Sequence, residues 1–219
     1  MSTLHSGTII AIEGAIGAGK TPLAKILAQE FGGESILQEP SQNPFLPKFY
    51  EDPQRWGLIT QVTFLLLRYQ VLNELHYRSL FSKAIVLDFL FEKDRIFAAL
   101  TLSERDYSVY LGLAQSIRKN SVLPTPDLVI YLKASPEKLW QSIQIRNRSE
   151  EEGLSPEFIN ELCDAYNRLF QHWEQSPLIV VNTHTVDFVN HREDRKLIVD
   201  AVLNTRGGVK YIGFGETND

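Results

Sequence analysis

Short runs of aliphatic and β-branched residues are separated along the chain by longer stretches in which apolar residues recur every three or four positions. None of the short runs alternates cleanly with polar residues, so each predicts a strand that is buried on both faces of a parallel sheet. The five runs are TIIAI (8–12), SILQ (35–38), AIVLD (84–88), DLVIYLK (127–133) and LIVVN (178–182).

The stretches between these runs have the periodicity of amphipathic helices. After the first run, Leu23, Ile26 and Leu27 fall on one helical face, and Gly32 and Gly33 predict the end of that helix. Strands that alternate with helices predict right-handed crossovers and a doubly wound α/β fold, with a five-stranded parallel sheet in a single domain. The other helices are expected at about 54–79, 104–119, 136–147, 156–174 and 190–204.

Size and composition are those of an ordinary globular protein. The 219 residues are enough for a sizeable core, and 43% of them are hydrophobic and 22% are charged. The formal charge of −5 argues against a nucleic-acid or membrane-surface partner, because either would favour a basic face. The single cysteine, Cys163, excludes an internal disulfide and fits a reducing compartment.

Further features concern location and metal binding. No apolar run is long enough to cross a bilayer, and MSTLHSG (1–7) lacks the basic region of a targeting peptide, so we expect a cytoplasmic protein. The Gly-rich tail, 207–219, is expected to be loosely held. The five histidines show no metal-ligand spacing with one another or with Cys163.

The segment GAIGAGKT (14–21) fits the phosphate-loop pattern G-x-x-x-x-G-K-[ST]. It follows a predicted strand and opens a predicted helix, so that the loop amides and the helix N-terminus would face anionic phosphate. Lys20 would reach the β- and γ-phosphates of ATP, and the Thr21 hydroxyl would bind Mg²⁺. The expected nucleotide-binding residues are Gly14, Ala15, Ile16, Gly17, Ala18, Gly19, Lys20 and Thr21.

Pro22 directly follows this loop. Proline is tolerated in the first turn of a helix, because its missing N–H has no intrahelical acceptor there. Pro22 therefore removes one potential phosphate donor and leaves the loop amides before it intact.

Carboxylates follow the second and third predicted strands, at the sheet edge where doubly wound folds bind ligands. Glu39 could accept the proton of a hydroxyl that attacks the γ-phosphate, or it could be an exposed turn residue before Pro40. Asp88 is placed to bind Mg²⁺, and Asp94 is either a helix cap or a carboxylate that reads a base. The chain has no N-K-x-D-like guanine signature, which disfavours a GTPase.

Taken together, the motifs resemble those of the deoxynucleoside kinases, of the bacterial deoxyadenosine/deoxyguanosine kinase type, over about residues 8–182. The resemblance implies that GAIGAGKT binds the phosphates of ATP and that Glu39 deprotonates the 5′-hydroxyl of a deoxynucleoside. In FYEDPQRW (49–56), Tyr50 matches a tyrosine that holds the sugar 3′-hydroxyl. A dimer formed by helix packing is also implied.

The same resemblance implies a base site and a lid. In the base site, Gln61, Arg68 and Asp94 match residues that read the base, and Phe97 matches an aromatic that stacks on it. The lid is expected at about 146–153. Its matching residues are the arginines Arg146 and Arg148, which would close over the transferring phosphoryl group, and Glu151 on the 3′-hydroxyl.

Simple physical arguments support these placements and leave alternatives. Gln61 and Arg68 are seven residues apart, so they share one helical face, where an amide and an Arg–Asp pair can bind a base edge. The alternative is a buried structural salt bridge. Tyr50 could be ordinary packing among nearby aromatics, and Arg146 and Arg148 could be an exposed helix end.

The chain departs from the family pattern at three positions. Phe89 and Ser142 stand where many members have arginine, and Pro22 removes a backbone donor. Because arginines aimed at phosphoryl charge accelerate phosphoryl transfer, slow turnover or a changed donor preference is conceivable.

The sequence thus predicts a P-loop kinase that uses ATP and Mg²⁺ to phosphorylate a deoxyribonucleoside, with a purine preferred and deoxycytidine left open. One rival is a nucleoside-monophosphate kinase of the thymidylate type, which would need more cations near Tyr50 than Arg55 supplies. The other rival is a non-catalytic relative that keeps the fold for nucleotide binding or assembly.

Overall fold

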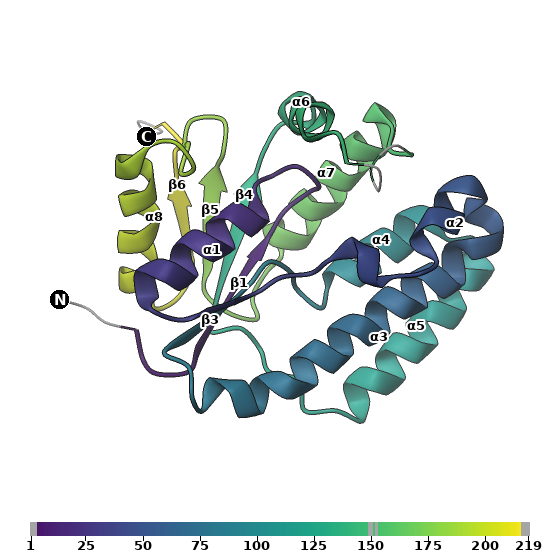
Figure 1. Cartoon of the computed structure of the whole chain (residues 1–219), viewed down its shortest axis with the longest axis horizontal. Helices are drawn as coiled ribbons and strands as arrows, with labels where there is room; N and C mark the ends of the chain where they lie inside the picture. The colour runs from purple at the N-terminus through teal and green to yellow at the C-terminus, as the bar shows by residue number, and fades with distance from the viewer. Residues whose placement is uncertain (1–3, 149–150, 152, 216–219) are drawn as a thin grey trace.

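The fold is built on a six-stranded, entirely parallel sheet with the strand order β2-β3-β1-β4-β5-β6 (Figure 1). The computed structural model describes residues 4–148, 151 and 153–215 of the chain. The strands are β1 (Thr8–Glu13), β2 (Glu34–Ile36), β3 (Ala84–Leu87), β4 (Leu128–Lys133), β5 (Leu178–Asn182) and β6 (Val209–Ile212). The helices are α1 (Lys20–Phe31), the 3₁₀ turn η1 (Pro40–Gln42), α2 (Leu46–Glu51), α3 (Pro53–Ser79), α4 (Lys93–Thr101), α5 (Glu104–Lys119), α6 (Pro136–Arg146), α7 (Pro156–Gln171) and α8 (Arg192–Asn204).

Strand β1 lies at the centre of the sheet between β3 and β4. Its Ile10 pairs with Val86 on one side and with Leu128 on the other. These three side chains are buried, as the unbroken apolar runs predicted. The chain builds β2 and β3 on one side of β1 and then β4, β5 and β6 on the other, so the topology reverses at the carboxyl end of β1. This switch point is where doubly wound folds bind ligands.

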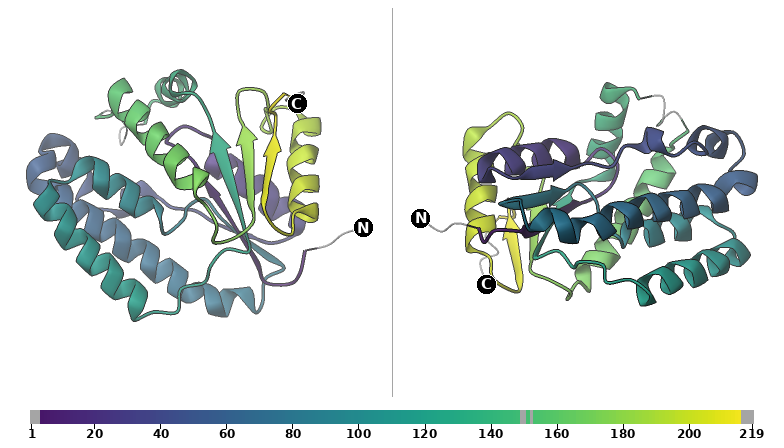
Figure 2. Two further views of the ribbon diagram at one scale, coloured as in Figure 1. Left: turned by 180° about the vertical axis from the view of Figure 1, so that it is seen from behind. Right: turned by 60° about the horizontal axis from the view of Figure 1, so that its bottom comes forward.

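Helices cover both faces of the sheet and extend beyond one end of it. Helix α1 lies in front of the sheet in Figure 1 and α7 lies behind it, and the view from behind in Figure 2 reverses the two. Helices α2, α3, α4 and α5 form a separate layer beyond the β3 side. The carboxyl ends of β1 and β3 therefore lie next to this helical layer.

The C-terminal tail departs from the expectation of five strands and a loose end. Residues Val209–Ile212 form a sixth strand parallel to β5, and the Gly213 carbonyl accepts hydrogen bonds from Asn182 and Thr185. The strand was missed because it is short and forms the sheet edge, where Tyr211 is exposed and Ile212 alone is buried. The end of the expected tail, 216–219, lies outside the described residues.

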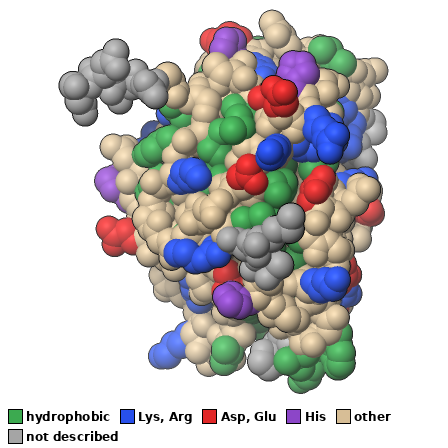
Figure 3. All heavy atoms as spheres, turned by 90° about the vertical axis from the view of Figure 1, so that its left-hand side faces the viewer, with side chains coloured by type: hydrophobic (Ala, Val, Ile, Leu, Met, Phe, Trp, Pro, Cys, Tyr) green, Lys and Arg blue, Asp and Glu red, His purple; other side chains and the backbone are tan. Residues whose placement is uncertain are grey.

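The long predicted helices are confirmed to within a few residues. The run at 35–38 is a strand at Glu34–Ile36, and α2 and the extent of α4 were not predicted. Among the described residues, no helix combines the length and apolarity needed to cross a membrane. On the face that carries α8, basic and acidic side chains are interspersed (Figure 3).

Candidate active site

The segment GAIGAGKT forms a loop between β1 and α1, as predicted, and its glycines let neighbouring elements approach closely. Gly17 has φ 90°, and a Cβ there would lie 3.0 Å from the Leu139 carbonyl of α6. Gly19 has φ 93°, and a Cβ there would lie 3.1 Å from the Phe188 ring in the loop after β5. Only glycine adopts such angles without strain. Because these glycines have no side chain, α6 and the β5–α8 loop can both lie directly against the phosphate loop.

Pro22 occupies the first turn of α1, where its missing N–H costs no helical hydrogen bond. The helix begins at Lys20, and the first intrahelical bond is donated by the following amide, Leu23 N, to the Gly19 carbonyl at 3.2 Å. The proline is therefore compatible with an intact phosphate loop, as the sequence indicated.

The side chain of Lys20 folds back over the phosphate loop. Its ammonium donates to the carbonyls of Gly14 at 2.7 Å and Ala15 at 3.0 Å. Burial and the nearby cation Lys93 lower the pKa of Lys20 to about 8, against the opposing effect of Glu13 and Asp88. An anion bound at the loop would favour the charged amine and raise this pKa again.

Thr21 and Asp88 meet beside the phosphate loop. The Thr21 hydroxyl donates to Asp88 Oδ2 at 2.6 Å, and Asp88 Oδ1 accepts from the backbone amide of Gln38 at 2.8 Å. A hydroxyl and a carboxylate side by side are oxygen ligands of the kind that Mg²⁺ takes next to nucleotide phosphates. The donor set at the end of β3 therefore fits the metal site that the sequence predicted.

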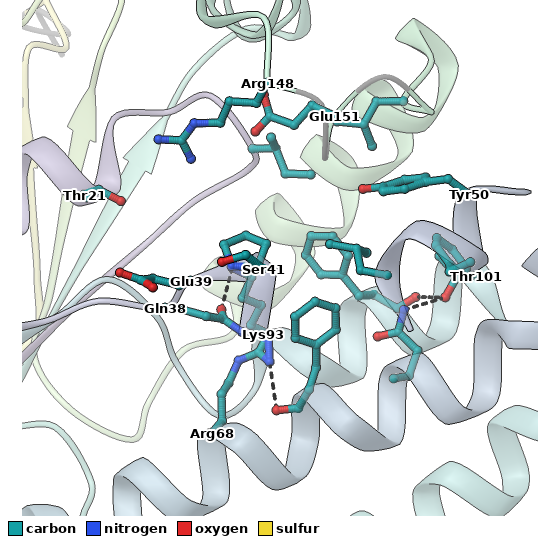
Figure 4. A pocket seen from close by; sticks show the side chains of 18 of the residues that line it. Thr21, Gln38, Glu39, Ser41, Tyr50, Arg68, Lys93, Thr101, Arg148 and Glu151 are labelled. Atoms are coloured by element: carbon teal, nitrogen blue, oxygen red, sulfur yellow. Dashed lines mark hydrogen bonds between the residues drawn. The ribbon is translucent and has the colours of Figure 1, made fainter. Parts of the chain in front are cut away.

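A cavity of about 530 Å³ opens from the phosphate loop toward the helical layer, and several of its residues are shown in Figure 4. This volume lies in the range of roughly 300–1,000 Å³ typical of small-molecule sites. Thr21 lines one part of it, and Glu39 lies exposed on the wall after β2. The other predicted residues that line it are Ile16, Tyr50, Gln61, Arg68, Phe97, Arg148 and Glu151.

Arg68 and Asp94 form a buried ion pair in this cavity wall, with 2.5 Å between Nη1 and Oδ1. Burial raises the pKa of Asp94 to about 6, although Arg68 acts in the opposite direction. Arg68 Nε and Asp94 Oδ2 have no hydrogen-bond partner among the described residues. Asp94 does not cap α4, whose N-cap residue is Glu92, so the capping alternative is not seen.

Gln61 and Phe97 complete the same wall. Gln61 donates to the Thr101 hydroxyl at 3.1 Å, and Thr101 in turn donates to the Phe97 carbonyl at 2.7 Å. This chain fixes the amide plane of Gln61, so its carbonyl and remaining N–H have a defined direction.

The lid follows α6, which ends where Asn147 takes the left-handed conformation (φ 46°). Arg148 and Glu151 line the cavity, whereas Arg146 forms an ion pair with Glu151. Ser149, Glu150 and Glu152 of the predicted lid lie outside the described residues.

Tyr50 lies directly under the lid. A Cβ on Gly153 would come within 2.4 Å of the Tyr50 ring, so the lid backbone rests on this side chain. Tyr50 also packs edge-to-face against Phe49, so this side chain both packs against a neighbouring aromatic ring and lines the cavity.

Sequence reasoning missed two residues of this region. Glu13 is completely buried and accepts from Gly14 N, Leu90 N and the Tyr166 hydroxyl. Lys93 lines the cavity beside Gln38. Glu13 ends an otherwise apolar strand, which was a usable signal, whereas nothing local marked Lys93.

A phosphate loop that opens into an acceptor cavity beneath an arginine-bearing lid defines the class of P-loop kinases. The family model for deoxynucleoside kinase matches residues 10–206, and the chain belongs to this family.

Three similar proteins are deoxyadenosine or deoxyguanosine kinases. The chain is 34% identical to a deoxyadenosine kinase of Dictyostelium discoideum, over 80% of this chain and 72% of that protein. It is 31% identical to a deoxyguanosine kinase of Bacillus subtilis, over 87% and 94%. The solved structure of a deoxyadenosine kinase from M. mycoides, with dCMP and a flexible dCDP bound, superimposes with a TM-score of 0.77 at 26% identity, covering 89% of this chain and 98% of that one.

Replacing Asp94 with asparagine tests the buried ion pair. Asp94→Asn leaves the Arg68 guanidinium buried without a counter-charge, so we expect the free energy of unfolding to fall by about 3 kcal/mol or more. The measurement is urea denaturation followed by circular dichroism. The exposed pair Glu74–Arg78 supplies the control, because Glu74→Gln should cost less than about 1 kcal/mol. Equal, small losses in both variants would contradict a structural role for the buried pair.

Proposed function

We propose that the protein transfers the γ-phosphoryl group of ATP to the 5′-hydroxyl of a deoxyribonucleoside, preferring a purine, in nucleotide salvage. One observation carries the proposal. A single cavity is lined by Thr21 of the phosphate loop at one part, by Glu39 between, and by Gln61 and Arg68 at another. A base bound against Gln61 and Arg68 would direct its sugar toward Glu39 and the phosphates.

In this mechanism Glu39 accepts the proton of the 5′-hydroxyl as that oxygen attacks the γ-phosphorus. The bond from the γ-phosphorus to the bridging oxygen breaks, and ADP leaves. Lys20 and the lid arginines Arg146 and Arg148 offset the charge on the phosphoryl oxygens. For Arg146 to do so, its side chain must turn away from Glu151, because the two form an ion pair.

Thr21 and Asp88 would hold Mg²⁺, which neutralises phosphate charge when bound. The 2.6 Å contact between Thr21 Oγ1 and Asp88 Oδ2 supports this assignment, since both oxygens already point to one place. Asp88 does not line the acceptor cavity itself.

The cations near Tyr50 favour an uncharged acceptor over a nucleoside monophosphate. Lys48 lies 4.6 Å and Arg55 5.3 Å from the centre of the Trp56 ring. Neither of them lines the cavity, so they are not placed to bind an acceptor phosphate. This disfavours a kinase of the thymidylate type.

The substrate is tested by the release of ADP from Mg-ATP with a panel of the four deoxynucleosides and their monophosphates. We expect turnover of deoxyadenosine or deoxyguanosine, lost by a factor of about 10² or more in Glu39→Gln because no base remains to accept the proton. Glu30→Gln, an exposed carboxylate change in the last turn of α1, is the matched control and should keep full activity. Turnover of a monophosphate alone would move the assignment to the neighbouring kinase class, and no turnover would favour a non-catalytic relative.

The lowered pKa of Lys20 predicts a pH dependence of ATP binding. ATP binds the ammonium form, so affinity holds below the pKa of about 8 and falls as the pH rises through it. Between pH 7.5 and 9.5 the dissociation constant should rise by about 25-fold, because the charged fraction of Lys20 falls from about three-quarters to about 3% over this range. Calorimetry across this range measures the change. Arginine stays charged throughout this range, so Lys20→Arg should make ATP affinity nearly independent of pH. A wild-type affinity that does not change up to pH 9.5 would contradict the prediction.

The proposal includes a homodimer that forms through α3 and α5. Exposed apolar side chains lie along both helices, with Ile59 and Leu66 two turns apart on α3 and Val109 and Leu113 one turn apart on α5. Exposed apolar side chains at helical spacing on two helices that pack together support this assignment, because apolar surface is typical of protein–protein interfaces.

Static light scattering tests the dimer. The wild type should have twice the mass of one chain, and Leu66→Glu should shift it toward the mass of one chain, because it buries a charge in the interface. A substitution at the exposed Val122, Val122→Glu, lies outside both helices and should leave the mass unchanged. A monomeric wild type would contradict the proposal.

A cytoplasmic location is also part of the proposal. Its support is Cys163, which is buried and free, as expected in a reducing compartment.

A further inference from the structure

Lys93 places a lysine amine in the active site in addition to that of Lys20. It is the first residue of α4, and its side chain lines the cavity between Gln38 and Arg68 (Figure 4). The ammonium donates to Gln38 Oε1 at 3.3 Å and lies 5.6 Å from the centre of the Phe97 ring. Both partners are neutral, so neither offsets the charge of the amine.

The carboxylates around Lys93 are already bonded to other groups. Asp94 pairs with Arg68, and Asp88 accepts from Thr21 and from the Gln38 amide. Glu13 is bonded by two backbone amides and a tyrosine hydroxyl. Among the described residues no carboxylate forms an ion pair with Lys93.

Burial lowers the pKa of Lys93, and Arg68 lowers it further, while Glu13, Asp88 and Asp94 raise it. A partly buried cation without a close counter-charge is costly, and an anion that enters the cavity would stabilise it. In the proposed reaction, the anion that passes this point is the phosphoryl group on its way to the 5′-oxygen.

The residue that follows Asp88 carries no charge. Phe89, one residue beyond Asp88, is buried at 1% exposure and lines a separate cavity together with Leu72 and Arg118. It therefore supplies no charge to the phosphoryl group. Lys93 lies four residues further along, and its side chain turns back into the active site, within electrostatic range of Lys20.

We propose that the Lys93 ammonium binds the non-bridging oxygens of the phosphoryl group during transfer and of the 5′-monophosphate that results. In this role Lys93 acts as the protonated ammonium, so it donates hydrogen bonds and moves no proton. Lys20 and Lys93 then hold the transferring group from the donor side and from the acceptor side. This inference rests on the proposed function, because it assigns a catalytic residue to that same site.

The test compares how Lys93→Met binds deoxyadenosine and deoxyadenosine 5′-monophosphate, which differ only in the phosphoryl group. By calorimetry, the dissociation constant for the monophosphate should rise by about tenfold or more, the loss expected for one charge-assisted contact. The value for deoxyadenosine should stay within about twofold, because the nucleoside has no anion for Lys93 to bind. The kcat should fall by roughly 10²-fold with little change in the KM for the nucleoside.

Two further variants separate this role from folding. Lys93→Arg keeps the charge and should recover most of the monophosphate affinity. Lys83→Met removes an exposed lysine before β3 and should match the wild type in every assay. The thermal midpoint of Lys93→Met should be no lower than that of the wild type, because the substitution removes a partly buried cation and breaks no ion pair. Affinities for Mg-ATP should agree among the variants.

Three outcomes overturn the inference. The first is a Lys93→Met protein that binds the monophosphate as the wild type does. The second is an equal loss for nucleoside and monophosphate, which would make Lys93 a base-reading or structural residue. In both cases wild-type turnover leaves the proposed function standing. The third is a wild type that phosphorylates no nucleoside, which overturns the proposed function and this inference with it.

Discussion

The completely buried carboxylate of Glu13 is the contact on which the geometry of the site depends. It ends the central strand and accepts hydrogen bonds from Gly14 N at 3.0 Å, Leu90 N at 2.9 Å and the Tyr166 hydroxyl at 3.0 Å. These donors belong to the phosphate loop, to the segment after β3 and to α7. A buried carboxyl group is costly unless its oxygens are hydrogen-bonded, so these contacts hold the three elements in position relative to one another. Glu13 therefore fixes the ATP-binding loop against the segment that leads to Lys93 and Asp94.

The site has a phosphate side and a base side, and the two differ in charge. The phosphate side is cationic and contains amines whose pKa values burial lowers, Lys20 to about 8 and Lys93 in the same direction. The base side contains a neutral amide, Gln61, and a pair whose charges cancel, Arg68 and Asp94. In the proposed function, ATP would bind on the side where cations offset its charge, and the uncharged nucleoside would bind on the side where hydrogen-bond directions are fixed.

How far the sequence predicts the protein differs from element to element. The apolar runs located all the strands that are buried on both faces, because burial leaves an unbroken pattern. They missed β6, since an edge strand with only Ile212 buried lacks that pattern. The phosphate loop and the pairing of Arg68 with Asp94 were predictable, because each depends on local spacing or on a matched motif. Lys93 and the contacts of Glu13 were not, because they bring together residues up to 153 positions apart, and only the folded chain shows which groups lack a partner.

The most direct test of the central claim is the identity of the phosphorylated atom. The wild-type protein would be incubated with Mg-ATP and deoxyadenosine, and the products followed by phosphorus NMR with proton coupling. Transfer within the single cavity predicts equal amounts of ADP and of a phosphomonoester coupled to the two 5′ protons of the sugar. Release of inorganic phosphate alone, or a phosphomonoester coupled to the 3′ proton, would contradict the placement of Glu39 at the attacking hydroxyl.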